Sequence, residues 1–358
     1  MKKSLIALAV LAASGAAMAQ SSVTLFGVVD AAYAYGSGSV ANKSQLKSSG
    51  YSSSRLGFRG VEDLGGGLSA SFWLEAGLNN DNGSGDATST NNQRASSVTS
   101  GVTSGGLTFN RRSTVSLNGG FGEVRLGRDY TPQFWNLTVF DPFGTVGVGT
   151  VGVGTTQTLN SSLGGPTAGR ASNSIGYFLP GNLGGFYGQV QYYMGENLSN
   201  AANKKDGNGL ALRAGYANGP INAAIAFSET KFLAGNIKAV NLGGSYDLGM
   251  AKIMAHYNQD KISGGNDGKG FLIGGLVPVG AGEVRLAYST YKIDTVGADP
   301  RTNKLALGYV HNLSKRTALY ATYARLSNKN GAAQALNGAV TGLNSNSNGY
   351  DFGISHSF

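Results

Sequence analysis

The stretch GRDYTPQFWNLTVFDPFGTVGVGTVGVGTTQTLNSSLGGPTAGR, residues 127–170, interrupts a chain that otherwise alternates apolar and polar residues. Short alternating segments, separated by turns rich in Gly, Asn and Asp, lie on both sides of it. The interruption lasts about 40 residues, far beyond the roughly 2–6 residues of an ordinary connection. Because connections of this length are usually functional, we expect this one to carry a function that the flanking strands support.

The N-terminal 19 residues have the pattern of a secretory signal peptide. Lys2 and Lys3 form a basic start, residues 4–13 an apolar run, and Ala17-Met18-Ala19 a cleavage site. The apolar run is too short to span a bilayer. We therefore predict an exported protein.

The composition favours strands and turns. The chain has no Cys, 57 Gly, 7 Pro, 17 Tyr and 15 Phe. No other segment has 18 uninterrupted apolar residues, which predicts that the chain has no transmembrane helix. The mean hydropathy is near zero, which is typical of a membrane barrel because half of each strand faces water.

The chain is moderately basic. Removing Lys2 and Lys3 lowers the formal net charge from +9 to +7. Such an excess fits anionic solutes, lipopolysaccharide, nucleic acid or scattered surface charge, and we expect no nucleic-acid partner.

The alternation predicts about sixteen strands. They are Ser22–Tyr35, Tyr51–Glu62, Leu68–Leu78, Leu107–Leu117, Gly122–Arg128, Ala171–Leu179, Phe186–Met194, Leu210–Tyr216, Ile221–Glu229, Ile237–Tyr246, Ala251–Gln259, Gly270–Val277, Glu283–Lys292, Lys304–His311, Thr317–Leu326 and Gly349–Phe358. Short turns alternate with long loops, as they do at the two ends of an outer-membrane barrel.

Charged residues on one face of the strands argue against a soluble sandwich. Leu56 and Phe58 point to one side of their strand, and Arg55 and Arg59 point to the other. Glu75 likewise lies opposite the apolar residues beside it. Charges along a concealed face need water there. We therefore predict an all-β fold, a transmembrane antiparallel β-barrel that occupies residues 20–358.

The last strand is expected to close this barrel. Tyr350, Phe352 and Phe358 fall on one face of it, and the chain stops on Phe358. Since unpaired backbone cannot remain in lipid, this strand must pair with the first one. We also expect aromatic girdles at the two membrane surfaces. The expected girdle residues are Tyr33, Tyr35, Tyr192, Tyr193, Tyr288, Tyr291, Tyr320 and Tyr323.

Six pieces of the chain resemble the general trimeric porins of Gram-negative bacteria, in particular the beta-proteobacterial group. The pieces are SSVTLFGVVD, SRLGFRGVEDLGGGL, RRSTVSLNGGFGEVRLGRDYTP, DPFG, GYVHNLSKRTALY and GYDFGISHSF. The resemblance implies sixteen strands, a homotrimer, and a third external loop folded into the lumen as an eyelet. It also implies that the second external loop, residues 79–106, latches onto a neighbouring subunit. The implied partners are outer-membrane lipid and lipopolysaccharide, the barrel-assembly machinery and small hydrophilic solutes.

The resemblance also implies a pore constriction with basic and acidic sides. The basic candidates are Arg55, Arg59, Arg111, Arg112 and Arg170, and the acidic ones are Glu75 and Asp141. Strand parity favours Arg112 over Arg111, although a bulge would exchange them. Because the arginines outnumber the carboxylates, a narrow aqueous slot between them would prefer anions.

Several alternatives stay open for individual residues. Each arginine could be a solvated loop charge, and Asp141 could be a turn residue before Pro142. The tandem TVGVG repeat at residues 145–154 is more Gly-rich than such loops usually are. It leaves open how far the loop protrudes and how wide the slot is.

Other functional classes find less in the residues. Only three histidines and no Cys are present, and no nucleophile with a nearby base stands out. We therefore expect no enzyme, no cofactor and no transition-metal site. The alternative functions are a substrate-specific channel, which would use an aromatic track along the lumen, and an adhesin-type barrel with a plugged lumen.

Overall fold

The computed structural model describes residues 22–86, 88, 91–93, 106–151 and 167–358. Its strands are β1 (Ser22–Ser37), β2 (Lys43–Ser48), β3 (Arg55–Gly65), β4 (Leu68–Asn79), β5 (Ser84–Gly85), β6 (Arg112–Gly119), β7 (Gly122–Tyr130), β8 (Arg170–Phe178), β9 (Phe186–Tyr193), β10 (Gly209–Asn218), β11 (Ile221–Thr230), β12 (Ile237–Asp247), β13 (Lys252–Ile262), β14 (Asp267–Val279), β15 (Gly282–Asp294), β16 (Arg301–Asn312), β17 (Thr317–Lys329) and β18 (Ser347–Ser357). A helix, α2 (Pro132–Val139), lies between β7 and β8. No helix among the described residues is long and apolar enough to cross a membrane.

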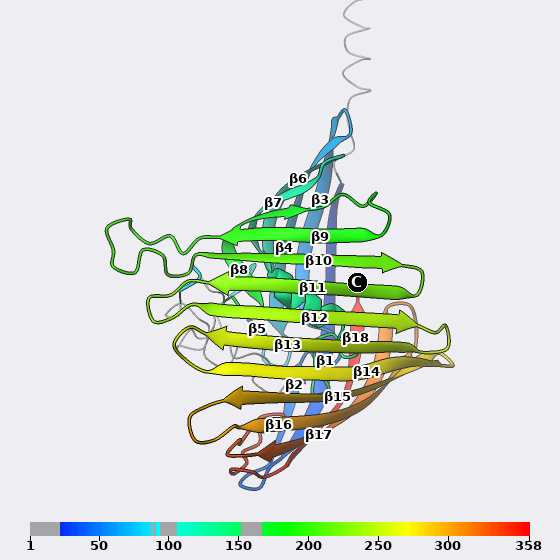
Figure 1. The fold of residues 1–358 in the computed structure, drawn as a ribbon. Helices are drawn as coiled ribbons and strands as arrows, with labels where there is room; N and C mark the ends of the chain where they lie inside the picture. Colours follow the sequence, from blue (N-terminus) through cyan, green and yellow to red (C-terminus); the bar gives the residue numbers. More distant parts are fainter. Residues whose placement is uncertain (1–21, 87, 89–90, 94–105, 152–166) are drawn as a thin grey trace, which may run out of the picture.

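The strands form one closed antiparallel barrel (Figure 1). β1 pairs with β18 on one edge and with β2 and β3 on the other, so no edge stays open there. β2 and β3 pair with successive parts of β1 and count as one interrupted strand, and β5 is a two-residue strand that pairs with the end of β4. In the described part of the chain, sixteen strands therefore close the barrel, as the alternation predicted.

Side chains alternate between an apolar outer face and a polar or small-residue inner face. Val115, Leu126 and Ile175 pair across β6, β7 and β8 and are about half exposed on the outside. Their neighbours Ser116 and Ser174 point inward and are buried. Because successive residues of a strand face opposite sides, this row is the apolar band that a membrane barrel presents to lipid.

Several strand boundaries differ from the sequence prediction, and one strand was missed. The strand expected over Tyr51–Glu62, for example, begins only at Arg55. Residues 107–111 are not part of β6, because side-chain hydrogen bonds replace the ladder at Thr108 and Asn110. The Asn110 side chain accepts a hydrogen bond from the Gly77 amide (2.8 Å), and the Thr108 hydroxyl bonds the Asp86 carbonyl (2.8 Å). β2 was not expected at all, since its sequence KSQLKS shows no apolar alternation.

The girdle prediction is wrong for three of its tyrosines. Tyr193, Tyr291 and Tyr320 are at most 6 % exposed and point inward. Tyr192, the immediate neighbour of Tyr193, is 44 % exposed on the outside. Adjacent residues of a strand cannot both face lipid, so only one member of such a pair can join a girdle.

The last strand lies where its sequence predicted. Tyr350 pairs with Tyr35 and Phe352 with Tyr33 across the β1–β18 seam. The Phe358 amide donates to the Gly27 carbonyl, and the Gly27 amide donates back, both at 3.1 Å. Phe352 and Phe358 are exposed on the outer face.

Two sequence predictions fall largely beyond the described residues. The signal peptide, residues 1–19, lies outside them, as does most of the loop expected to latch onto a neighbour. Within the described part of that loop, the Asn92 side chain bonds the backbone of Ser172 and Met194 in the same chain.

Candidate functional site

The connection between β7 and β8 begins with α2, which is tied to the opposite strands. Pro132 stands at the first turn, where a missing amide costs no hydrogen bond. The Asn136 side chain donates to the Ala224 carbonyl (3.0 Å) and to Asn241 (2.9 Å), and its oxygen accepts from Arg213 (2.9 Å). α2 therefore contacts inward-facing groups of β10, β11 and β12.

Glycines in the barrel wall leave room for the bulky residues that follow α2. A Cβ at Gly243 on β12 would overlap the ring of Phe140, and one at Gly349 on β18 would overlap Val148. Phe143 and Val148 also belong to a buried apolar cluster. Its other members are Leu272, Ala287, Ala306, Ala324, Leu326 and Leu336. The loop is thus packed against the wall as well as hydrogen-bonded to it.

Two charged residues of the wall hold the backbone of the same loop. The Asp351 carboxylate accepts a hydrogen bond from the Val148 amide (2.8 Å) and pairs with Lys47 (3.0 Å). Lys304, which is 1 % exposed, donates to the Thr150 carbonyl. Buried charges of this kind persist only where partners satisfy them.

Asp141, the acidic residue that the resemblance implied for the loop, is buried and hydrogen-bonded within its own loop. Its carboxylate is 4 % exposed and accepts hydrogen bonds from the amides of Phe143 (2.9 Å) and Thr145 (3.1 Å) and from the Thr150 hydroxyl (2.8 Å). The Val151 amide adds a fourth at 3.2 Å. The carboxylate is therefore engaged in shaping its own loop, because short Asp side chains readily bond the amides that follow them. This geometry matches the turn-residue alternative for Asp141.

The predicted arginines converge instead on Glu75 of β4. Arg111 Nε lies 2.6 Å from Glu75 Oε1, and Arg55 Nε lies 3.9 Å from the same oxygen. The Trp73 indole donates to Glu75 Oε2 at 3.0 Å. One carboxylate thus faces two guanidinium groups.

Arg170 joins this cluster through Tyr130. Its NH2 donates to the Tyr130 hydroxyl (2.9 Å), and Arg111 NH2 donates to the same hydroxyl (3.1 Å). Arg170 Nε donates to the Arg111 carbonyl at 2.9 Å, and its guanidinium lies 4.3 Å from the Tyr130 ring centroid. Three arginines from separate strands or loops are therefore held beside one carboxylate.

Arg112 and Arg59 form a second group around Trp73. Their guanidinium carbons lie 4.6 Å and 5.2 Å from its ring centroids. Arg112 is also 3.7 Å from Asp129. Both members of the Arg111-Arg112 pair are thus on the inner side, because Arg111 precedes the strand and does not follow its parity.

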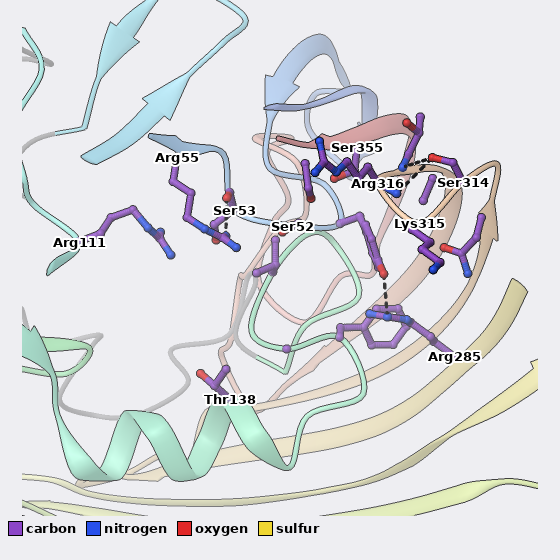
Figure 2. Close-up of a pocket in the computed structure, with 18 of the residues that line it drawn as sticks. Ser52, Ser53, Arg55, Arg111, Thr138, Arg285, Ser314, Lys315, Arg316 and Ser355 are labelled. Atoms are coloured by element: carbon purple, nitrogen blue, oxygen red, sulfur yellow. Dashed lines mark hydrogen bonds between the residues drawn. The ribbon is translucent and has the colours of Figure 1, made fainter. Parts of the chain in front are cut away.

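A cavity of about 420 Å³ opens beside the first group. Figure 2 shows Arg55 and Arg111 on one side of it and Arg285, Lys315 and Arg316 on the other. Thr138 of α2 and the loop residues Phe143, Gly144 and Val146 line it as well. Among the described residues that line this cavity, five are basic and none is acidic.

Part of this lining was not predicted from the sequence. Arg285 alternates with the exposed Leu286 on β15, so parity alone could have placed it inside. Lys315 and Arg316 sit in a turn, where parity does not apply. The aromatic partners were missed too, since Tyr51, Trp73, Tyr130, Phe178 and Tyr187 each lie under an arginine.

Comparison with known proteins gives one consistent family. A model of the Gram-negative porin family matches residues 5–331. Outer membrane porin protein 32 of Delftia acidovorans is 41% identical over 375 aligned residues, which cover 100% of both chains. A solved structure described as an anion-selective porin from Comamonas acidovorans has a TM-score of 0.80 and 36% identity, covering 95% of this chain and 100% of that one. Major outer membrane protein P.IB of Neisseria meningitidis serogroup B is 31% identical over 209 residues, 56% of each chain.

Proposed function

The chain belongs to the Gram-negative porin family, a class of outer-membrane barrels, and on that premise we propose that it is a diffusion channel that prefers small anions. The proposal rests first on the cluster of Arg55, Arg111 and Arg170 around a single carboxylate, Glu75. Positive charges held close together in a water-filled slot with low-dielectric walls raise the local concentration of anions. The similar porin of Comamonas acidovorans, which is described as anion-selective, supports the same preference.

The channel needs a constriction, and the loop between β7 and β8 is our candidate for it. Its contacts with inward-facing groups of β11, β12, β16 and β18 support a position across the lumen. In such a position Thr138, Phe143 and Val146 would face the arginines across the cavity of Figure 2. The slot would then lie between a basic wall and a loop that carries its one acidic side chain, Asp141, buried among its own amides.

The alternative of a substrate-specific channel finds less support. Such a channel would use bare aromatic rings along the lumen. Here the inward rings of Trp73, Tyr130 and Tyr187 are covered by guanidinium groups, so they present charge to a solute. The family and the fold point to a channel and not to an enzyme.

Further partners follow from the same family. We propose a homotrimer in outer-membrane lipid. The apolar residues Val23 and Leu25 of β1 and Val115 of β6, which are exposed on the outer face, support contact with lipid or a second copy. Lys204, Lys205 and Lys231 of the longer loops would meet lipopolysaccharide phosphates, and the exposed Phe358 at the chain end would be offered to the barrel-assembly machinery.

The reversal potential of the purified protein in a planar bilayer under a KCl gradient tests the proposed function. We expect chloride preference, weakened by Arg55→Ala and by Arg170→Ala. Cation preference would mean that the carboxylates dominate the slot. An absence of conductance would contradict the channel function and favour the alternative of an adhesin-type barrel.

A further inference from the structure

The second barrel strand is broken where it passes the middle of β1. β2 pairs with β1 up to Ala31–Ser48, and β3 resumes at Val28–Arg55. Residues 49–54 therefore stand opposite only two residues of β1 and leave the sheet as a bend. Ser49 has a positive φ of 68°, a conformation that a non-glycine residue adopts only where its surroundings hold it.

Asp30 of β1 holds this bend from inside the barrel. One carboxylate oxygen accepts from the Gly50 amide (2.8 Å) and the Tyr320 hydroxyl (2.6 Å). The other accepts from the amides of Tyr51 (3.2 Å) and Ser52 (2.8 Å). Asp30 is fully buried, and hydrogen bonds to a buried ionised acceptor are among the strong ones. The bend is thus a built feature with its own anchor.

The bend in turn orients two arginines of the cavity. The Ser53 carbonyl accepts from Arg55 NH1 at 2.8 Å. The Tyr51 ring lies 4.7 Å below the Arg285 guanidinium, and its hydroxyl accepts from Arg285 NH2 at 3.4 Å. Ser53 and Tyr51 thus place two positive charges from separate strands, β3 and β15, around one cavity.

The bend also reaches the tip of the loop that follows α2. Any Cβ on Gly147 would overlap the Gly50 carbonyl, so the two backbones touch. Tyr51, Ser52 and Ser53 line the same cavity as Thr138 and Val146 (Figure 2).

We propose that the residue 49–54 bend is a second constriction element of the channel, and that Asp30 acts as a positioning residue that sets Arg55 through it. The proposal rests on the proposed function. Tyr51 narrows the passage on the side of β15, and the Ser53 carbonyl fixes the direction in which Arg55 points its charge. Size selection and anion preference then depend on a segment outside the long loop.

Tyr51→Ala tests the size part of the proposal. Removing the ring widens the passage, so we expect single-channel conductance to rise roughly 1.5-fold and larger neutral sugars to enter liposomes faster. Tyr187→Ala is the matched control, because Tyr187 also lies under an arginine, Arg213, but does not line the cavity. Equal effects of the two variants would overturn the constriction role of Tyr51.

Two variants of Asp30 separate positioning from direct charge. In Asp30→Asn, either orientation of the amide turns an NH2 group toward at least one backbone amide of the bend, which can only donate, so the bend loses hydrogen bonds. Asp30→Glu keeps the charge but changes the reach of the carboxylate. A positioning role predicts that both variants lose anion preference and gain current noise. A direct electrostatic role predicts higher anion preference in Asp30→Asn and wild-type behaviour in Asp30→Glu, and that pattern would overturn the positioning role.

The outcomes are separable from a failure of the proposed function. A wild-type channel without anion preference would overturn the latter, while the sugar rates of Tyr51→Ala and Tyr187→Ala would still decide the role of the bend. If the Asp30 variants do not assemble, Ser53→Pro and Tyr51→Phe replace them. Anion preference lost in Ser53→Pro but kept in Tyr51→Phe would support the proposal, and preference kept in both would overturn it.

Discussion

Two walls of this barrel, built from strands of the same kind, are used in opposite ways. The basic wall comprises β3, β4, β6, β7 and β8 and projects long arginine side chains inward around Glu75. The seating wall comprises β12, β14, β16 and β18 and presents Gly243, Gly274, Gly308 and Gly349 to the loop residues Phe140, Pro142, Phe143 and Val148.

The difference shows how one barrel can position arginine side chains on one wall and pack a loop closely against another. On the basic wall the arginines are held by stacking on rings and by shared acceptors such as the Tyr130 hydroxyl. On the seating wall the absence of side chains lets a loop pack as closely as a protein interior. We expect ion preference to depend on the first wall and conductance and stability on the second.

The largest change in ion selectivity should come from removing the arginines of the basic wall. In the triple variant Arg55→Ala, Arg111→Ala and Arg170→Ala, Glu75 remains as an unopposed carboxylate. We expect the chloride-to-potassium permeability ratio, from the reversal potential, to fall about tenfold. Arg325→Ala is the control, because Arg325 is exposed on the outer face of β17. An unchanged ratio in the triple variant would place the selectivity elsewhere.

Adding a single methyl group to a glycine of the seating wall should have the next largest effect, which we expect on stability and conductance. In Gly243→Ala the new Cβ meets the ring of Phe140, so the loop must shift or the barrel must strain, at a cost of about 1–3 kcal/mol. We expect a lower thermal unfolding temperature and an altered conductance with the sign of ion preference unchanged. Gly244→Ala is a matched control, since its nearest neighbour would be the Asn222 carbonyl at 3.6 Å. Equal unfolding temperatures for the two variants would contradict the packing of Phe140 on the wall.

Neutralising Glu75, the carboxylate beside Arg55 and Arg111, should increase the anion preference of the channel. Glu75→Gln removes the charge that offsets Arg55 and Arg111, so we expect the chloride permeability ratio to rise about twofold. Glu229→Gln, which loses a pair with Lys238 outside the cavity, should leave the ratio unchanged. A fall in the ratio of Glu75→Gln would mean that Glu75 mainly orients the arginines.

The smallest change in selectivity is expected for Asp141→Asn. Its carboxylate serves the amides of the loop, so we expect a reversal potential close to that of the wild type and a noisier open-channel current. A shift as large as that of Glu75→Gln would return Asp141 to the acidic side of the slot. The reversal potential and the open-channel current can be recorded in the same planar bilayer.

The barrel, its strand number and the inward position of the strand residues Arg55 and Glu75 could be predicted from the sequence alone, whereas three tyrosines were assigned to the wrong face. A period of two and the alternation of short and long connections need only local chemistry, so Arg55 and Glu75 were placed inside before any contact was known. The direction of residues outside the strand ladder could not be predicted in this way. Arg111 precedes its strand, Lys315 and Arg316 sit in a turn, and β2 carries no apolar pattern.

The contacts of the inward residues depend on parts of the chain that are far apart in the sequence. Asp141 and Asp30 are both acidic and both buried, yet each accepts hydrogen bonds from backbone amides that a loop or a bend brings to it. Tyr51 and Arg285 are 234 residues apart in the chain and meet across the cavity. Such pairings depend on which strands the closed barrel sets face to face, and a period along one strand carries no information about the strand opposite.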